Sequence, residues 1–162
     1  DLGRDRKKGA FWHTLIGYKY KMSNLQAALG LGQLERVESL IKRKRRIFEW
    51  YYKKLGSIEG LSMNTEKPWA RNVYWMSCIV IDRKLSITRD EFMKELKNKM
   101  IDTRPFFFPF SMLPMYKTNV DNPVAYHVGL KGINLPSGVN LTKEEVDYIS
   151  AQVIDILNKS SL

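Results

Sequence analysis

Residues 17–35 read GYKYKMSNLQAALGLGQLE, and this stretch joins a basic aromatic segment to the start of a helix. Two tyrosines and two lysines alternate over residues 18–21. Ser23 and Gln26 then have the spacing of a capping box, in which the serine hydroxyl accepts a bond from the third helical N–H and the glutamine side chain accepts one from the serine N–H. The sequence therefore predicts a helix that begins directly after Ser23.

This junction is also a candidate anion site. Lys19 and Lys21 supply positive charge, and Tyr18 and Tyr20 supply hydroxyl donors. They lie just before a helix N-terminus, where unpaired N–H groups and the helix dipole favour an anion. Phosphate is the simplest such anion, and an ordinary basic surface loop is the alternative that composition leaves open. Gly30 and Gly32 weaken the following helix by about 1 kcal/mol each relative to alanine, so we expect compensation from close packing against another backbone.

Composition narrows the class of protein. The chain has 162 residues, of which 44% are hydrophobic, enough for one domain or a domain with an extension. Its formal net charge of +10 suits an anionic partner. No apolar run approaches the ~18 residues of a membrane span, and the first residues do not resemble a signal peptide. The single cysteine, Cys78, favours a reducing compartment, so we expect a cytoplasmic protein. His13 and His127 are too isolated to indicate zinc.

The order of predicted elements indicates a small sheet with helices packed on it. The apolar period of the first helix continues to Leu55 and indicates one long helix or two helices with a bend, ended by Gly56. Two further capping boxes begin at Thr88 and Thr142. The predicted elements after Gly56 are a strand at 74–81, a helix after Thr88, a strand at 101–108, a short helix at 122–130, a strand at 132–136 and a last helix after Thr142. This is the pattern of an α/β or α+β sandwich.

Several side chains are assigned to the core by this pattern. Phe92, Leu96 and Met100 share one face of the helix after Thr88, and Cys78 lies within a strand that reads as buried. In the last helix the predicted inward positions are Val146, Ile149, Val153, Ile156 and Leu157.

Two segments carry unusual chemistry. The basic run KRKRR at 42–46 has the composition of a nucleic-acid or nuclear-import segment, but the absence of any recognised nucleic-acid motif favours a solvated helix face whose side-chain stems cover apolar surface. In the run RPFFFP at 104–109, alternation along a strand places Phe106 and Phe108 on one face and Phe107 on the other. Burial on both faces is one interpretation. An aromatic wall beside Arg104, suited to an anionic ligand with a flat or sugar-like part, is the other.

These residues resemble a known family. The run from His13 to Gly30, followed by Gln33-Leu34-Glu35, is similar to the segment Gly-Tyr-Asn-Tyr-Arg-Met-Ser/Thr and its Gln-Ala-Ala helix in the nucleotide-sugar aminotransferases of the DegT/StrS type, and most similar to perosamine synthase-like members. The later landmarks occur in the family's order and extend the resemblance over nearly the whole chain. They are Gly3-Arg4-Asp5-Arg6, Arg104 to Pro109, Pro114-Met115-Tyr116, Leu135-Pro136-Ser137 and the helix after Thr142.

The resemblance implies the fold-type-I architecture of pyridoxal 5'-phosphate (PLP) enzymes. Residues 1–22 would end the large PLP-binding domain and form an interface loop, residues 23–55 would be the long connecting helix or helices, and residues 56–162 would form the small C-terminal α/β domain. The family implies a homodimer that moves an amino group from glutamate to a keto-deoxysugar on a nucleotide diphosphate, for surface polysaccharide such as O-antigen. Its Schiff-base lysine would lie upstream of this chain, so we expect no catalytic residue here and no transamination by this chain alone.

The resemblance also assigns roles to single residues. Lys19 stands where the family has an asparagine that contacts the cofactor phosphate, and a lysine there still supplies a donor and adds charge. Lys21 replaces the usual arginine with its charge but without its bidentate geometry. The candidate residues for the sugar-nucleotide site are Arg4, His13, Tyr20, Lys21 and Arg104. From the residues alone, His13 beside Trp12 is an acid–base candidate, although packing is the commoner role for such a histidine.

Three other functions remain as alternatives. One is a PLP-dependent sugar dehydratase of the same family, in which a histidine replaces the Schiff-base lysine. The second is a non-catalytic basic module that binds nucleic acid, although no recognised motif supports it. The third is a structural dimerisation domain. Salt-dependent nucleic-acid affinity would identify the basic module.

Overall fold

The computed structural model describes residue 7, residue 18 and residues 20–82, 85–116 and 121–160. The chain divides into two compact units, Asp1–Val37 and Glu38–Leu162. The predicted capping box at Ser23 is confirmed, because the Gln26 N–H donates to the serine hydroxyl and the Gln26 side chain accepts from the Ser23 N–H at 2.9 Å. It opens helix α1, Asn24–Leu34, the described helix of the first unit.

Two helices, and not one, occupy the region from Ser23 to Leu55. Helix α1 ends at Leu34, and α2 spans Val37–Leu55 in the second unit from Glu38 onward. None of the residues of α1 is buried, whereas α2 buries Ile47, Phe48, Tyr51 and Leu55. A Cβ added at Gly30 or Gly32 would meet no atom within 4 Å. Close packing at these glycines therefore does not occur within the described chain and stays a prediction for a contact with another molecule.

The second unit is built on one antiparallel sheet of four strands in the order β1-β2-β4-β3. The strands are short: β1 spans Leu61–Met63, β2 Cys78–Ile81, β3 Arg104–Pro105 and β4 Gly132–Asn134. Ile79 pairs with both Met63 and Ile133, which places β2 and β4 at the centre. The remaining helices are α3 at Arg89–Asn98, α4 at Pro123–Lys131 and α5 at Lys143–Ser160, with 3-10 turns η1 at Phe110–Met112 and η2 at Pro114–Tyr116.

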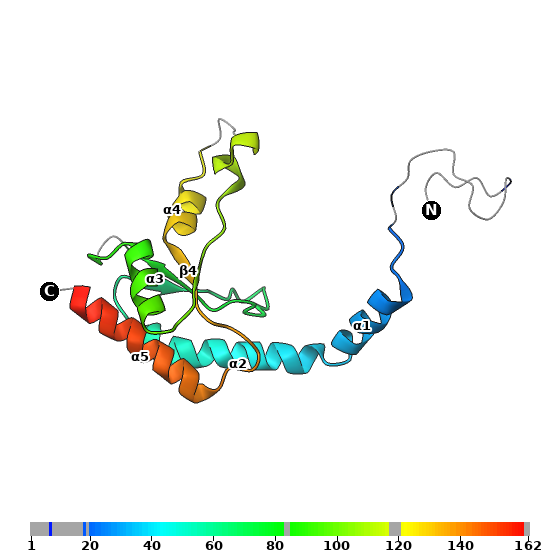
Figure 1. Cartoon of the computed structure of the whole chain (residues 1–162), viewed down its shortest axis with the longest axis horizontal. Coiled ribbons are helices and arrows are strands. Elements are labelled where there is room, and N and C mark those ends of the chain that lie inside the picture. Colours follow the sequence, from blue (N-terminus) through cyan, green and yellow to red (C-terminus); the bar gives the residue numbers. More distant parts are fainter. Residues whose placement is uncertain (1–6, 8–17, 19, 83–84, 117–120, 161–162) are drawn as a thin grey trace. The chain divides into compact units, whose positions relative to one another are not determined.

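One hydrophobic core joins three helices to one face of this sheet. Helices α2, α3 and α5 contribute Tyr51, Phe92 and Val153, and the sheet contributes Ile79 and Ile133, all fully buried. Figure 1 shows α2 and α5 below the sheet of the second unit and α3 beside β4. The predicted small sheet flanked by helices is confirmed. None of the described helices combines the length and apolar composition that a membrane crossing requires.

Side-chain burial confirms most of the predicted core and corrects two residues. The five predicted inward positions of α5 are all buried, as are Phe92 and Leu96. Met100 is instead 94% exposed, because α3 ends at Asn98 and Met100 turns out of the helix with φ +61°. Cys78 is half-buried, and its thiol donates to the Asn134 side-chain oxygen across the sheet at 3.2 Å.

The strands are shorter than the sequence predicts. The strand expected at 74–81 begins only at Cys78, and the one expected at 101–108 is reduced to Arg104–Pro105. Proline at 105 has no N–H, and the backbone bond of Phe106 to the Gly132 carbonyl is the last one to β4 before the chain leaves the sheet. The sequence pattern missed β1, whose three residues are too few to show a period.

Candidate functional site

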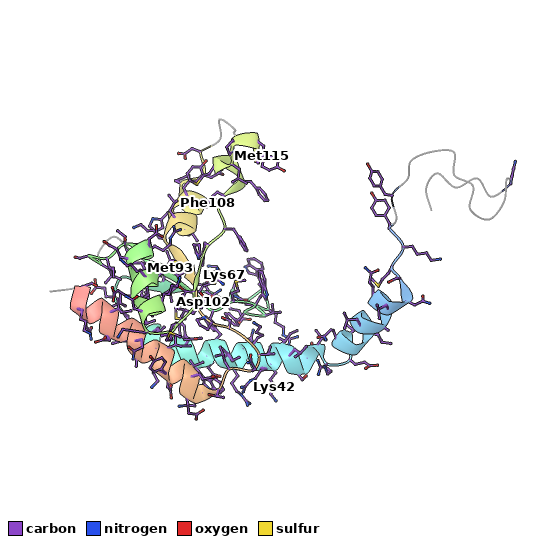
Figure 2. The ribbon with its side chains drawn as sticks, viewed as in Figure 1. Lys42, Lys67, Met93, Asp102, Phe108 and Met115 are labelled. Atoms are coloured by element: carbon purple, nitrogen blue, oxygen red, sulfur yellow. The ribbon has the colours of Figure 1, made fainter. Side chains whose placement is uncertain are left out.

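An aromatic segment follows β3 and leaves the sheet. Phe107 and Phe110 are 77% and 75% exposed, and Phe108, Met115 and Tyr116 are also exposed. Two of them are labelled in Figure 2 on the part of the second unit that stands away from its core. Burial on both faces of a strand, one of the two interpretations of RPFFFP, is therefore wrong for the described chain. The expected alternation of Phe106 and Phe108 on one strand face is also wrong, because β3 ends at Pro105.

Phe106 explains why the segment departs here. Its ring lies over Gly132, so close that a Cβ at that glycine would stand 2.3 Å from the ring atoms. Gly129 in α4 faces Pro109 in the same way, with a Cβ placed 2.9 Å from the proline ring. The absence of a side chain at these two glycines lets the start of the segment pack closely against β4 and α4. The exposed rings beyond it form a surface.

Arg104 stands at the base of this segment, at the start of β3. Its guanidinium donates to Asp102 at 2.8 Å, and both side chains are largely exposed. An exposed ion pair of this kind contributes little to stability, so the guanidinium can exchange Asp102 for an anionic ligand. Arg104 directly precedes the aromatic segment in the sequence, and its role beside these rings stays a prediction.

The other predicted site residues lie at the N-terminal end. Tyr20 and Lys21 are exposed just before α1, and the Tyr20 ring lies 6.0 Å from that of Tyr18. Arg4, His13 and Lys19 fall outside the described residues. Tyr20 and Lys21 belong to the first unit and Arg104 to the second.

The basic run of α2 has a structural role that the sequence did not reveal. Lys44 donates to the carbonyls of Trp75 and Ser137 at 2.6 and 2.5 Å. Arg43 donates to the carbonyls of Val139 and Leu141, and its guanidinium lies 5.2 Å from the Trp50 ring centre. These cations tie distant loops to the helix. Burial, the largest influence on Lys44, lowers the pKa of its ammonium group.

Arg45 makes the third tie. It donates to both carboxylate oxygens of Glu66, at 2.7 and 2.9 Å, and to the Asn72 carbonyl. The Arg45 bonds, followed by one from the Asn72 N–H, lower the pKa of Glu66 to about 2. Arg71, in the same 64–77 loop, makes a second bidentate pair with Glu38 of α2, which lowers the pKa of that carboxyl. Loop 64–77 is thereby fastened to one side of α2.

The basic run is more than a solvated helix face. Arg43, Lys44 and Arg45 are engaged with the protein, while Lys42 and Arg46 are exposed. Sequence reasoning could not find these ties, because their partners are mostly backbone carbonyls up to 98 residues away. Over the residues that the structure describes, no three His, Cys, Asp or Glu side chains gather as metal ligands.

Comparison with known proteins identifies relatives. The chain is 38% identical over 144 residues to GDP-perosamine synthase of Escherichia coli O157:H7, covering 88% of this chain and 38% of that protein. It is also 38% identical over 142 residues to GDP-perosamine synthase of Vibrio cholerae, with 86% of this chain and 38% of that one covered. The chain thus spans about two fifths of the length of the curated relatives that it matches.

Solved structures share the fold. The aminotransferase TlmJ from Streptoalloteichus hindustanus superposes with a TM-score of 0.84 over 99% of this chain and 43% of its own, at 22% identity. The PLP-form of the putative sugar aminotransferase Spr1654 from Streptococcus pneumoniae gives 0.75 over 86% of this chain and 36% of its own, at 26% identity. The DegT/DnrJ/EryC1/StrS aminotransferase family matches residues 1–154. The chain therefore belongs to the DegT/DnrJ/EryC1/StrS aminotransferase family.

Proposed function

We propose that this chain is the C-terminal part of an enzyme that moves an amino group from glutamate to a keto-deoxysugar carried on a nucleotide diphosphate. The main support for this proposal is the 38% identity to GDP-perosamine synthases over most of the chain. Those relatives favour a GDP-linked, perosamine-type sugar. The domain limits 1–22, 23–55 and 56–162 belong to the same proposal, as does a cytoplasmic location, which suits the free thiol of Cys78.

The cofactor in this proposal is PLP, which when bound would carry the amino group between donor and sugar. Among the described residues, Tyr20 and Lys21 offer a hydroxyl and an ammonium immediately before a capped helix, and this donor set fits a phosphate group. Lys19 would donate to the cofactor phosphate from the same loop. Replacing Lys19 with alanine in the longer enzyme should weaken PLP retention, measured by equilibrium dialysis. Unchanged retention would remove Lys19 from the cofactor site.

The described residues of the second unit suit the sugar nucleotide. Arg104 would hold a phosphate or sugar hydroxyl, and the exposed rings of Phe107 and Phe108 would exclude water from the bound sugar. Arg4, His13, Tyr20 and Lys21, all in the first unit, are the other residues that we propose for sugar-nucleotide binding. Replacing Arg104 with alanine should raise the KM for the sugar nucleotide and leave that for glutamate unchanged.

A homodimer is part of the same proposal. The leucines at 25, 29, 31 and 34 of α1 are exposed, and the helix has open space around both of its glycines. Apolar side chains and small residues on one helix are typical of an interface. Sedimentation of the longer enzyme over a range of concentrations tests this part independently of activity.

The decisive experiment supplies the longer enzyme with PLP, nitrogen-labelled glutamate and a GDP-linked keto-deoxysugar. Label in the sugar product, detected by mass spectrometry, would support the aminotransferase. Loss of water from the sugar without incorporated nitrogen would replace it with the dehydratase of the same family. Absence of both products would refute catalysis on this substrate class.

A further inference from the structure

A second concave site lies on the outer side of α2, within the second unit alone. Its volume is about 800 Å³, within the range of ligand pockets. Helix α2 and the 64–77 loop form its walls. The lining residues are Glu38, Ser39, Lys42, Arg45, Arg46, Phe48, Glu49, Tyr52, Arg71 and Tyr74. We call this site the α2 cleft.

The charges of the α2 cleft are unevenly compensated. Arg45 is paired with Glu66, and Arg71 with Glu38, each through two bonds. Glu49, the other carboxylate of the lining, pairs with Lys53 at 3.3 Å.

Two cations of the α2 cleft remain. In the part of the chain that the structure describes, Lys42 and Arg46 have no ion-pair partner, and both are exposed. They are four residues apart on α2, so their side chains lie on one face and repel each other. An anion between them would relieve that repulsion.

The floor of the α2 cleft is aromatic and rigid. The rings of Phe48 and Tyr74 stack with centroids 3.8 Å apart and planes 7° from parallel, and Arg45 lies 5.4 Å from the Tyr74 ring centre. Tyr74 has φ +47°, a left-handed backbone that an aromatic residue rarely adopts. Its N–H is held by the Asn72 side chain at 2.8 Å, and the Arg45 bond to the Asn72 carbonyl fixes the same turn.

A free aromatic face completes the site. The Tyr52 ring is tilted against Phe48 with centroids 5.8 Å apart, and the side chain is 53% exposed. Tyr52 therefore exposes part of its ring in the same cleft as Lys42 and Arg46. A ligand that uses both features carries a flat ring and more than one negative charge.

We propose that the α2 cleft binds a nucleoside diphosphate, with its phosphates on Lys42 and Arg46 and its base on the Tyr52 ring. The site contains none of the residues assigned to PLP or to the sugar nucleotide, and the proposal does not rest on the aminotransferase assignment. A ligand here would contact both α2 and the loop that α2 holds.

Calorimetric titration of the chain with GDP, and separately with inorganic phosphate, tests this proposal. The double variant K42A/R46A should weaken GDP binding by at least about tenfold, as expected for loss of charge-assisted contacts. The variant Y52L should weaken GDP binding by at least about fivefold and leave phosphate binding unchanged, because a stacked base is lost. Thermal melts of each variant show that it folds.

Matched controls separate this site from other cations. The double variant K94A/K97A removes the same charge from exposed positions on α3 and should bind GDP like the parent chain. The proposal is overturned if GDP does not bind at millimolar concentration, if phosphate binds equally well, or if K94A/K97A weakens binding as much as K42A/R46A.

Discussion

The rings of Phe48 on α2 and Tyr74 in the 64–77 loop stack face to face, with centroids 3.8 Å apart and planes 7° from parallel. Both residues are buried. Their apolar contact joins the same helix and loop that the ion pair of Arg45 with Glu66 joins. The loop is therefore fixed by both its side chains and its carbonyls.

The stacked pair should show measurable coupling. In a double-mutant cycle of Phe48→Leu and Tyr74→Leu, we expect a coupling free energy of about 0.5–1.5 kcal/mol, the range found for aromatic pairs. Urea denaturation provides the free energies of unfolding. The pair Phe48→Leu and Tyr148→Leu, whose side chains belong to different surfaces, should be additive within about 0.5 kcal/mol. Additivity in the stacked pair as well would refute the coupling.

Lys44 and Lys42 are neighbours in the basic run and should behave differently. Lys44→Met leaves the carbonyls of Trp75 and Ser137 without their donor, so we expect a loss of about 1–3 kcal/mol of stability. Lys42→Met changes an exposed position and should stay within about 0.5 kcal/mol of the parent chain. Equal effects of the two substitutions in chemical denaturation would contradict the structural role of Lys44.

The pair of Arg45 with Glu66 should make stability depend on acid pH. The pKa of Glu66 falls to about 2 in the folded chain, against about 4.3 for an unperturbed glutamate. A lowered pKa contributes stability above the unfolded value, and that contribution is lost as the pH falls from about 4.3 towards 2.

Glu66→Gln removes this contribution, so its stability should change less than that of the parent chain over the same pH interval. Denaturant titrations at a series of pH values measure the two slopes. Glu95→Gln on α3, which also removes one exposed carboxylate, should keep the parent slope. Parallel slopes for the parent and Glu66→Gln would rule the pair out as a source of acid sensitivity.

Met100 occupies a backbone conformation better suited to glycine. Its φ of +61° costs about 1–2 kcal/mol for a residue with a Cβ, and its side chain is exposed and loses no packing when removed. After the entropy cost of glycine is subtracted, Met100→Gly should raise the free energy of unfolding by roughly 0.5–1 kcal/mol, and the melting temperature should rise with it. Lys97→Gly inside α3 should lower stability by about 1 kcal/mol. A lowered melting temperature for Met100→Gly would contradict the strain.

Local signals in the sequence predicted the elements that depend on neighbouring residues. The boxes at Ser23, Thr88 and Thr142 mark the starts of three helices, since both members of each box are three residues apart. The apolar spacing of α5 likewise predicted its buried face. These features need no information from distant parts of the chain.

Contacts between distant segments were beyond such signals. The ties of Arg43 and Lys44 end on backbone carbonyls, which every residue has, so no residue type marks them. The end of β3 depends on how Phe106 meets Gly132 across the sheet. Of the predicted anion loop, Tyr18, Tyr20 and Lys21 are described and exposed. The α2 cleft was missed because its cations looked like the rest of a basic helix.

Helix α1 has a consequence for solution work. It has 11 residues, none buried, and an isolated helix of that length is only marginally stable in water. If a partner orders α1, the helical circular dichroism signal should rise with protein concentration. That signal would then report the extent of assembly. Replacing Gly30 and Gly32 with alanine would change this concentration dependence. Alanine strengthens the isolated helix but also crowds any molecule that packs against it.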